Sequence, residues 1–99
     1  MKYRIEYSPE VEDHLQVLSK RQQVTVLNTV DKKLKSQPAV ETRNRKPMRP
    51  NPIAPWELRI GNLRVYYDVE EKAEPVVYIR AVGMKERNQV RIGKEIIAL

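Results

Sequence analysis

Two arginines in one predicted β-hairpin are the strongest chemical signal in the sequence. Apolar and polar residues alternate over residues 56–60 and again over residues 63–68, and a Gly-Asn pair separates the two runs. This pattern predicts two strands joined by a two-residue turn, which places Arg59 directly opposite Arg64. Like charges opposite one another destabilise a sheet, so the pair indicates an anionic ligand, and the planar guanidinium suits phosphate oxygens. The alternative is a solvated sheet face that tolerates both arginines.

The positive charge of the chain is concentrated in its C-terminal part. The formal net charge is +6 at pH 7, of which residues 1–42 contribute +1 and residues 43–99 contribute +5. A basic surface confined to one region is typical of proteins that bind nucleic acid or an acidic protein partner.

Composition argues against metal and redox chemistry. The chain has no cysteine and a single histidine, His14. No carboxylate cluster with metal-ligand spacing accompanies this histidine, so we expect no metal ion and no other cofactor. His14 flanks the apolar stripe of a predicted helix, which favours a partly buried or surface position over a catalytic role.

The N-terminal third predicts one strand followed by two helices. Alternation over residues 2–7 indicates a half-buried strand. Ser8 and Pro9 then supply a capping residue and a first helical residue for a helix that ends near residue 19 or 20. A second helix is predicted over residues 21–37, and Pro38 stops it. The predicted apolar faces are Val11, Leu15 and Leu18 in the first helix and Val24, Leu27, Val30 and Leu34 in the second.

Residues 38–55 predict a stiff, extended loop. They contain five prolines, which exclude a regular helix or a central strand. A long loop of this kind in a small domain is more often functional than idle. The alternative is a variable connector whose charge only keeps it soluble. The basic residues of this loop are Arg43, Arg45, Lys46 and Arg49.

The C-terminal segments predict one buried strand and a shorter helix. Residues 76–82 are apolar at nearly every position, as expected for a central strand covered on both faces. We expect Gly83 to end this strand and residues 84–91 to form a loop that enters a short helix, which Gly93 breaks. The apolar tail, residues 95–99, is predicted either to form a strand or to pack on a partner.

These elements predict an α+β fold. The order is strand, helix, helix, strand, strand, strand, which gives a mostly antiparallel sheet with the helical hairpin packed on one face. Its length favours a single domain over residues 1–99. The other face would carry Arg59, Arg64 and Tyr66. There is no apolar run of membrane-spanning length and no signal-peptide pattern at the N-terminus, so we expect a cytoplasmic protein.

Together these features resemble the RelE/ParE superfamily of toxins from type II toxin–antitoxin pairs. The resemblance rests on the order of elements, the basic loop, the LRVYY run of the hairpin and the VGMKER run after it, and it spans nearly the whole chain. The basic segment at residues 83–87 is similar to that of the RelE branch. The resemblance implies a RelE-like fold and a toxin that inhibits translation by cleaving mRNA in the ribosomal A site. It also implies an acidic antitoxin as partner.

Cleavage of RNA without a metal sets the roles that the resemblance implies. The ribose 2′-OH attacks the adjacent phosphate, so a base, an acid and cations for the developing charge are required. The resemblance places Arg64 at the family's phosphate-stabilising arginine and Arg59 at a position usually filled by a catalytic lysine. It places Lys85 and Arg87 at the basic pair after the strand. Arginine does not deprotonate in proteins, so Arg59 stabilises charge only and Lys85 is the better general acid.

Two residues depart from the family pattern. Glu57 stands where RelE proteins often have a lysine, and it is either a general base or a neutralising partner of Arg59. Arg91 stands where a tyrosine often stacks on a base, and either Arg91 or Tyr66 is expected to take over this contact. The predicted RNA-binding residues are Arg43, Arg45, Lys46, Arg49, Tyr66 and Arg91.

Two further functions are compatible with the same resemblance. One is a ParE-like toxin that binds DNA gyrase and does not cleave RNA. The other is a RelE-fold protein whose activity is weakened or lost because the roles at Glu57 and Arg91 go unfilled. Lys85 and Arg87 favour the endonuclease over the gyrase toxin, whereas Glu57 and Arg91 favour the protein without activity.

Overall fold

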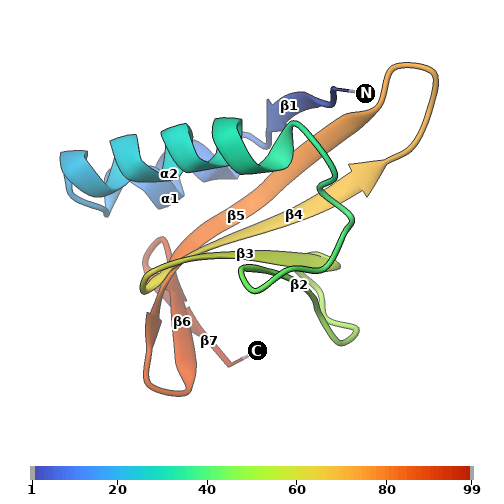
Figure 1. The fold of residues 1–99 in the computed structure, drawn as a ribbon. Coiled ribbons are helices and arrows are strands. Elements are labelled where there is room, and N and C mark those ends of the chain that lie inside the picture. The colour runs from blue at the N-terminus through green and yellow to red at the C-terminus, as the bar shows by residue number, and fades with distance from the viewer. Residues whose placement is uncertain (1, 99) are drawn as a thin grey trace.

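The computed structural model describes residues 2–98, in which two helices lie on one face of a seven-stranded sheet (Figure 1). Within this range no helix is long and apolar enough to cross a membrane. The elements in chain order are β1 (Arg4–Tyr7), α1 (Glu10–Gln16), α2 (Lys20–Leu34), β2 (Arg45–Pro47), β3 (Trp56–Ile60), β4 (Leu63–Glu70), β5 (Val76–Glu86), β6 (Gln89–Ile92) and β7 (Glu95–Ile97).

The sheet is mostly antiparallel, as predicted. Strands β2 to β7 lie side by side in sequence order, and each pairs antiparallel with the next. Strand β1 pairs parallel with the first part of β5. The last part of β5 pairs with β6 on that same edge, because β4 occupies the other edge. The long strand β5 therefore joins β1 and the C-terminal hairpin to the rest of the sheet.

The β3–β4 hairpin has the register that the sequence predicts. Arg59 pairs with Arg64, and Glu57 pairs with Tyr66. Gly61 lies in the turn with φ of 58°, a backbone conformation that glycine adopts without strain. The prediction that these four side chains share one face of the sheet is therefore confirmed.

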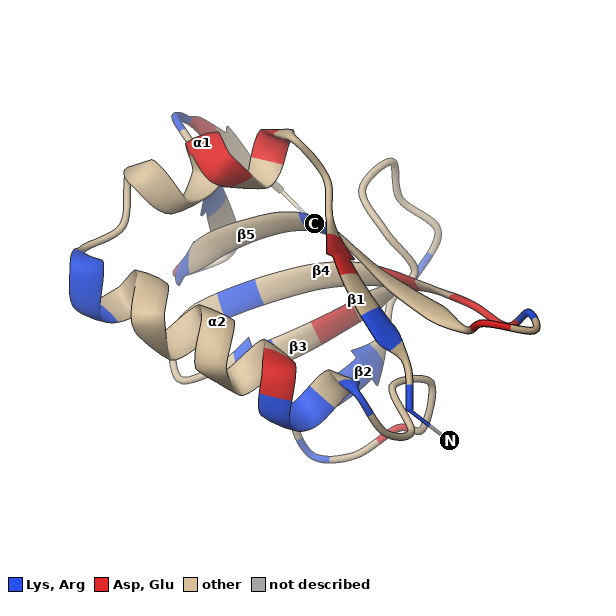
Figure 2. Cartoon of the chain, turned by 90° about the horizontal axis from the view of Figure 1, so that it is seen from above, with Lys and Arg blue, Asp and Glu red and all other residues tan. Residues whose placement is uncertain are grey.

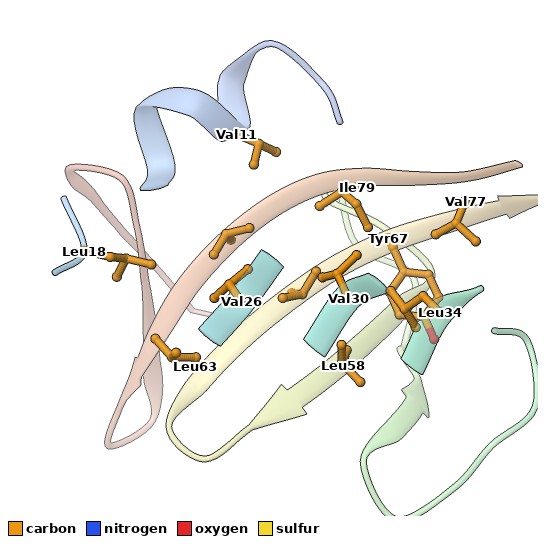
Figure 3. Close-up of a cluster of buried hydrophobic side chains, with 12 residues drawn as sticks. Val11, Leu18, Val26, Val30, Leu34, Leu58, Leu63, Tyr67, Val77 and Ile79 are labelled. Atoms are coloured by element: carbon orange, nitrogen blue, oxygen red, sulfur yellow. The ribbon is translucent and has the colours of Figure 1, made fainter. Parts of the chain in front are cut away.

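The main core lies between the helices and the sheet (Figure 3). Val26, Val30 and Leu34 of α2 are buried against sheet residues that include Leu58 and Tyr67. The predicted face of this helix was wrong in part, since Val24 and Leu27 are 52% and 39% exposed. The buried stripe of α2 consists of Val26, Val30 and Leu34, which are four residues apart. Leu27 lies at the margin of this stripe and Val24 lies outside it.

The helix boundaries differ from the prediction: α2 ends at Leu34, before the predicted residue 37, and one capping motif determines where it begins. The hydroxyl of Ser19 accepts a hydrogen bond from the backbone N–H of Gln22, and the Gln22 side chain accepts one from the N–H of Ser19. This capping box starts α2 at Lys20. The first helix already ends at Gln16, and Pro9 rather than Ser8 is its N-cap, with no capping side chain.

The proline-rich loop folds over the second face of the sheet. Its first part forms the short edge strand β2, which the sequence did not predict. Asn51 shapes the rest, because its side chain accepts hydrogen bonds from the N–H groups of Ile53 and Ala54 and donates to the carbonyl oxygens of Arg49 and Ala54. A second apolar cluster results beneath the loop, formed by Ala54, Tyr66, Ala81, Val90 and Ile92, with Met48, Ile53 and Ile97 at its margin.

The C-terminal segment is a β-hairpin, so the predicted loop and short helix are wrong. Strand β5 continues through Gly83 to Glu86, and β6 and β7 follow. A Cβ atom at Gly83 would lie 2.5 Å from the carbonyl oxygen of Arg91. Glycine is thus used here for close approach of two strands and does not terminate one. The predicted tail forms β7, and its last residue, Leu99, lies outside the described residues.

We predict that Gly83→Ala separates β6 from β5 and lowers the free energy of unfolding by roughly 1–3 kcal/mol, because the clash is with backbone. Gly61→Ala is the matched control. Its Cβ would meet nothing within 4 Å, so only backbone strain of roughly 1 kcal/mol is expected. Chemical denaturation measures both changes, and a Gly83→Ala variant as stable as wild type would contradict the packing described.

Candidate functional site

An open cleft of about 790 Å³ lies on the face of the sheet opposite the helices. The loop around β2 and the β6–β7 hairpin both extend from this side of the sheet (Figure 1). Figure 2 shows basic segments on the neighbouring strands β2, β3 and β4. The charged residues of the cleft are Lys46, Arg49, Glu57, Arg59, Arg64 and Lys85, and its apolar wall is formed by Val90, Ile97 and Ala98.

Strand register places the cleft residues together. Arg64 pairs with Gly83 of β5, and Lys85 lies two residues further along the same strand. Side chains two residues apart in a strand share a face, so Arg64 and Lys85 point to the same side of the sheet. Lys46 pairs with Glu57 across β2 and β3. The side chains of Arg64, Lys85 and Lys46 therefore lie on one face of the sheet, as a common basic site requires.

Glu57 is the buried carboxylate of the cleft. The residue is 8% exposed. Its Oε1 atom accepts a hydrogen bond from Arg59 Nε at 2.8 Å, and its Oε2 atom lies 3.9 Å from Arg64 Nε. One negative charge thus stands between two guanidinium groups that the hairpin places opposite one another. This arrangement favours the neutralising role over that of a free general base.

Arg64 is held in place by the hairpin turn. Its Nη1 atom donates hydrogen bonds to the carbonyl oxygens of Gly61 at 2.7 Å and Leu63 at 2.9 Å. The side chain is only 13% exposed. Among residues 2–98, no hydrogen bond uses Nε or Nη2 of this guanidinium. These two atoms form the edge that binds a carboxylate or a phosphate with two parallel hydrogen bonds.

Arg49, Arg59 and Lys85 are the accessible cations of the cleft. The Arg59 side chain is 48% exposed, and Lys85 is an exposed residue. Within the described range Lys85 makes no ion pair, whereas Lys46 lies 3.4 Å from Glu41. The cleft thus combines a fixed guanidinium with accessible cations around it, which suits binding of a polyanion and stabilisation of charge that develops on it.

Several predicted site residues lie outside this cleft. Arg87 and Arg91 line a separate depression at the β5–β6 turn, where Arg91 Nε lies 2.8 Å from Glu86 Oε1. Arg45 donates to the carbonyl oxygens of Lys33 and Val40 and so fixes the loop to α2. Arg43 is exposed and does not line the cleft.

Tyr66 is not available for base stacking, so this prediction is corrected. The residue is fully buried beneath the loop, with 0% exposure. Burial raises the pKa of its hydroxyl, and the neighbouring charge of Glu57 raises it further. The sequence did hold a signal for this burial: the apolar pair Ile53 and Ala54 inside an otherwise polar and proline-rich loop. The wall formed by Ile97 and Ala98 was missed because a helix was predicted before it.

His14 has a structural position away from the cleft. Its Nδ1 atom accepts a hydrogen bond of 3.3 Å from the N–H of Val82, at the part of the β5 edge that lies between β1 and β6. The neutral ring then carries its proton on Nε2. Within residues 2–98, acidic and histidine side chains form no group of three that could hold a metal ion.

Comparison with known proteins identifies the fold. No protein-family model and no curated protein matches the sequence. Among solved structures, the protein is similar to a chain of the toxin–antitoxin complex RelBE2 from Mycobacterium tuberculosis, with a TM-score of 0.72. The chain has a RelE-like fold. The match covers 86% of this chain and 100% of the other at 21% sequence identity. At this identity the likeness shows the fold alone.

We predict that protonation of His14 destabilises the fold. Burial lowers its pKa below the ordinary value of 6.5, although the carboxylates of Glu10, Asp13 and Glu95 oppose this shift. The unfolded chain therefore binds the proton more readily, and the free energy of unfolding should fall as the pH drops below about 6.5. His14→Gln removes the only histidine. Urea denaturation at pH 7.5 and 5.5 should show a smaller pH effect in this variant, and an equal effect would contradict the assignment.

Proposed function

We propose that the protein is the toxin of a type II toxin–antitoxin pair and a ribosome-dependent mRNA endonuclease that inhibits translation. The observation that carries this proposal is the convergence of Arg59, Arg64 and Lys85 in one cleft on a RelE-like fold. The similar solved chain belongs to a toxin–antitoxin complex. In this proposal residues 1–99 act as one domain in the cytoplasm.

The proposed reaction is attack of a ribose 2′-OH on the adjacent phosphate. The 2′-oxygen gives its proton to solvent water and bonds to phosphorus, and the bond from phosphorus to the 5′-oxygen breaks, which leaves a cyclic 2′,3′-phosphate and a free 5′-OH. Arg64 and Arg59 stabilise the charge that develops on the phosphate oxygens. Lys85 gives a proton to the leaving 5′-oxygen. No metal takes part in this scheme.

The remaining charged residues are assigned by their positions. Lys46 and Arg49 line the cleft and would contact RNA beside the reacting phosphate. Arg43, Arg87 and Arg91 lie outside it, so we assign them to outlying RNA or ribosome contacts. The 2.8 Å hydrogen bond from Arg59 supports a neutralising role for Glu57.

We predict that Arg64→Ala lowers the rate of mRNA cleavage roughly 100-fold or more, as loss of a charge-stabilising donor does in other enzymes. Lys85→Ala should lower the rate roughly 100-fold through loss of the proton donor. The measurement is growth of cells after induction, with mapping of transcript 5′ ends. Arg80→Ala is the matched control, because Arg80 is exposed, lies 3.7 Å from Asp68 and does not line the cleft.

Induction of wild type should produce cuts within translated codons. Growth arrest with intact transcripts would reject the endonuclease, and inhibited supercoiling in the same cells would favour a ParE-like gyrase toxin. Harmless overexpression of wild type would indicate a RelE-fold protein without toxicity.

We also predict a small acidic antitoxin that covers the cleft. Arg59 and Lys85 are exposed there, and a partner of opposite charge would bind this surface and exclude RNA. The product of the neighbouring gene should co-purify with the protein and abolish transcript cleavage. Failure to co-purify at low ionic strength would contradict this partner.

A further inference from the structure

Two features in the cleft and beneath it have no part in the proposed reaction. The first is the position of Glu57 Oε2, which lies 3.9 Å from Arg64 Nε and thus near the open edge of that guanidinium. The second is the hydroxyl of Tyr66, which is buried and has no hydrogen-bond partner among residues 2–98. Tyr66 pairs directly with Glu57 in the sheet, so the two features adjoin.

We propose that Glu57 occupies the phosphate position on Arg64 in the free protein, and that a bound phosphodiester displaces this carboxylate onto the hydroxyl of Tyr66. The proposal rests on the function proposed above, since it takes a phosphodiester as the ligand of the cleft. It makes Glu57 an internal competitor of the substrate and Tyr66 a positioning residue.

The contacts of Arg64 define where the anion binds. Nη1 is committed to the carbonyl oxygens of Gly61 and Leu63, which fixes the plane of the guanidinium. The Nε and Nη2 donors remain for one oxyanion group with two oxygens. A separation of 3.9 Å is too long for a hydrogen bond, so Glu57 satisfies this edge by charge alone. A phosphodiester that makes two hydrogen bonds there binds the same edge more strongly.

The hydroxyl of Tyr66 provides a place for the displaced carboxylate. A buried donor without an acceptor is unfavourable, and few such groups persist in folded proteins. Burial raises the pKa of this hydroxyl, and the charge of Glu57 raises it further. The hydroxyl therefore stays protonated at neutral pH and remains a donor. When Glu57 leaves Arg64, it gains a hydrogen bond from Tyr66 in place of the lost charge contact.

This exchange gives the cleft selectivity among anions. A weakly held anion does not displace a buried carboxylate that is already bound to Arg59 at 2.8 Å. A phosphodiester does so because Arg64 binds it by two hydrogen bonds while Arg59 and Lys85 lie around it. Glu57 thus lowers the affinity of the cleft for weakly bound anions. It also offsets the repulsion between Arg59 and Arg64 when the cleft is empty.

The first test measures binding of a 2′-O-methyl dinucleotide, which carries one phosphodiester and resists cleavage, by NMR titration of the purified protein. Glu57→Gln keeps the size of the side chain and removes the competing charge. It should bind the dinucleotide about tenfold more tightly than wild type. Glu70→Gln is the matched control, since it removes one charge from an exposed residue outside the cleft, 3.4 Å from Lys72. Equal affinity in all three proteins would overturn the proposal.

The second test compares two adjacent buried tyrosines. Tyr66→Phe should weaken dinucleotide binding about fivefold, because the displaced carboxylate then has no donor, and it should leave the melting temperature of the free protein unchanged or higher. Tyr67→Phe should lower the melting temperature, because the Tyr67 hydroxyl donates to the carbonyl oxygen of Pro38 at 2.7 Å, and should leave binding unchanged. A Tyr66→Phe variant that is less stable but binds normally would show a purely structural role.

Arg64→Ala separates this inference from the proposed function. If Arg64→Ala abolishes binding but Glu57→Gln and Tyr66→Phe bind as wild type does, the exchange is wrong and the phosphate site stands. If wild type, Glu57→Gln and Arg64→Ala all bind the dinucleotide equally weakly, the cleft is no phosphodiester site, and both proposals fail.

Discussion

A single buried carboxylate makes the rest of the site possible. The β3–β4 turn places Arg59 opposite Arg64, an arrangement that like charges alone would destabilise. Glu57 lies between the two guanidiniums at 2.8 Å and 3.9 Å, and the turn carbonyls hold Arg64 from the other side. Positive charge is thereby fixed in position before any ligand arrives. Such preorganisation is what stabilisation of a developing anion requires, because the protein need not rearrange during the reaction.

One face of the sheet carries the main core and the other carries the cleft. Both helices cover one face and form the main core, as Figure 3 shows. The other face is covered only in part, by the loop that Asn51 organises and by the C-terminal hairpin. The cleft is the space left between these two segments, over the charged ends of β3, β4 and β5. Close approach of β6 at Gly83 sets the position of one wall.

Local patterns in the sequence were sufficient for the hairpin, and nonlocal contacts decided what was missed. Alternation and a Gly-Asn turn determine the β3–β4 register within a dozen residues, so Arg59, Arg64 and Glu57 were placed correctly. Burial of Tyr66 depends on the loop that carries Ile53 and Ala54, so the alternation within its own strand does not show it. Gly83 was interpreted as a strand terminator, although its role is contact with β6. The α2 face was misassigned because Val24 and Leu27 fit a helical period nearly as well as Val26 does.

The central claim is that Arg64, fixed by the turn and balanced by Glu57, binds phosphate. Thermal unfolding in the presence and absence of inorganic phosphate, at constant ionic strength, tests it directly, since a ligand that binds only the folded state raises the melting temperature. Phosphate should raise the melting temperature of wild type and have no effect on Arg64→Ala. An equal rise in both proteins, or no rise in either, would contradict the account.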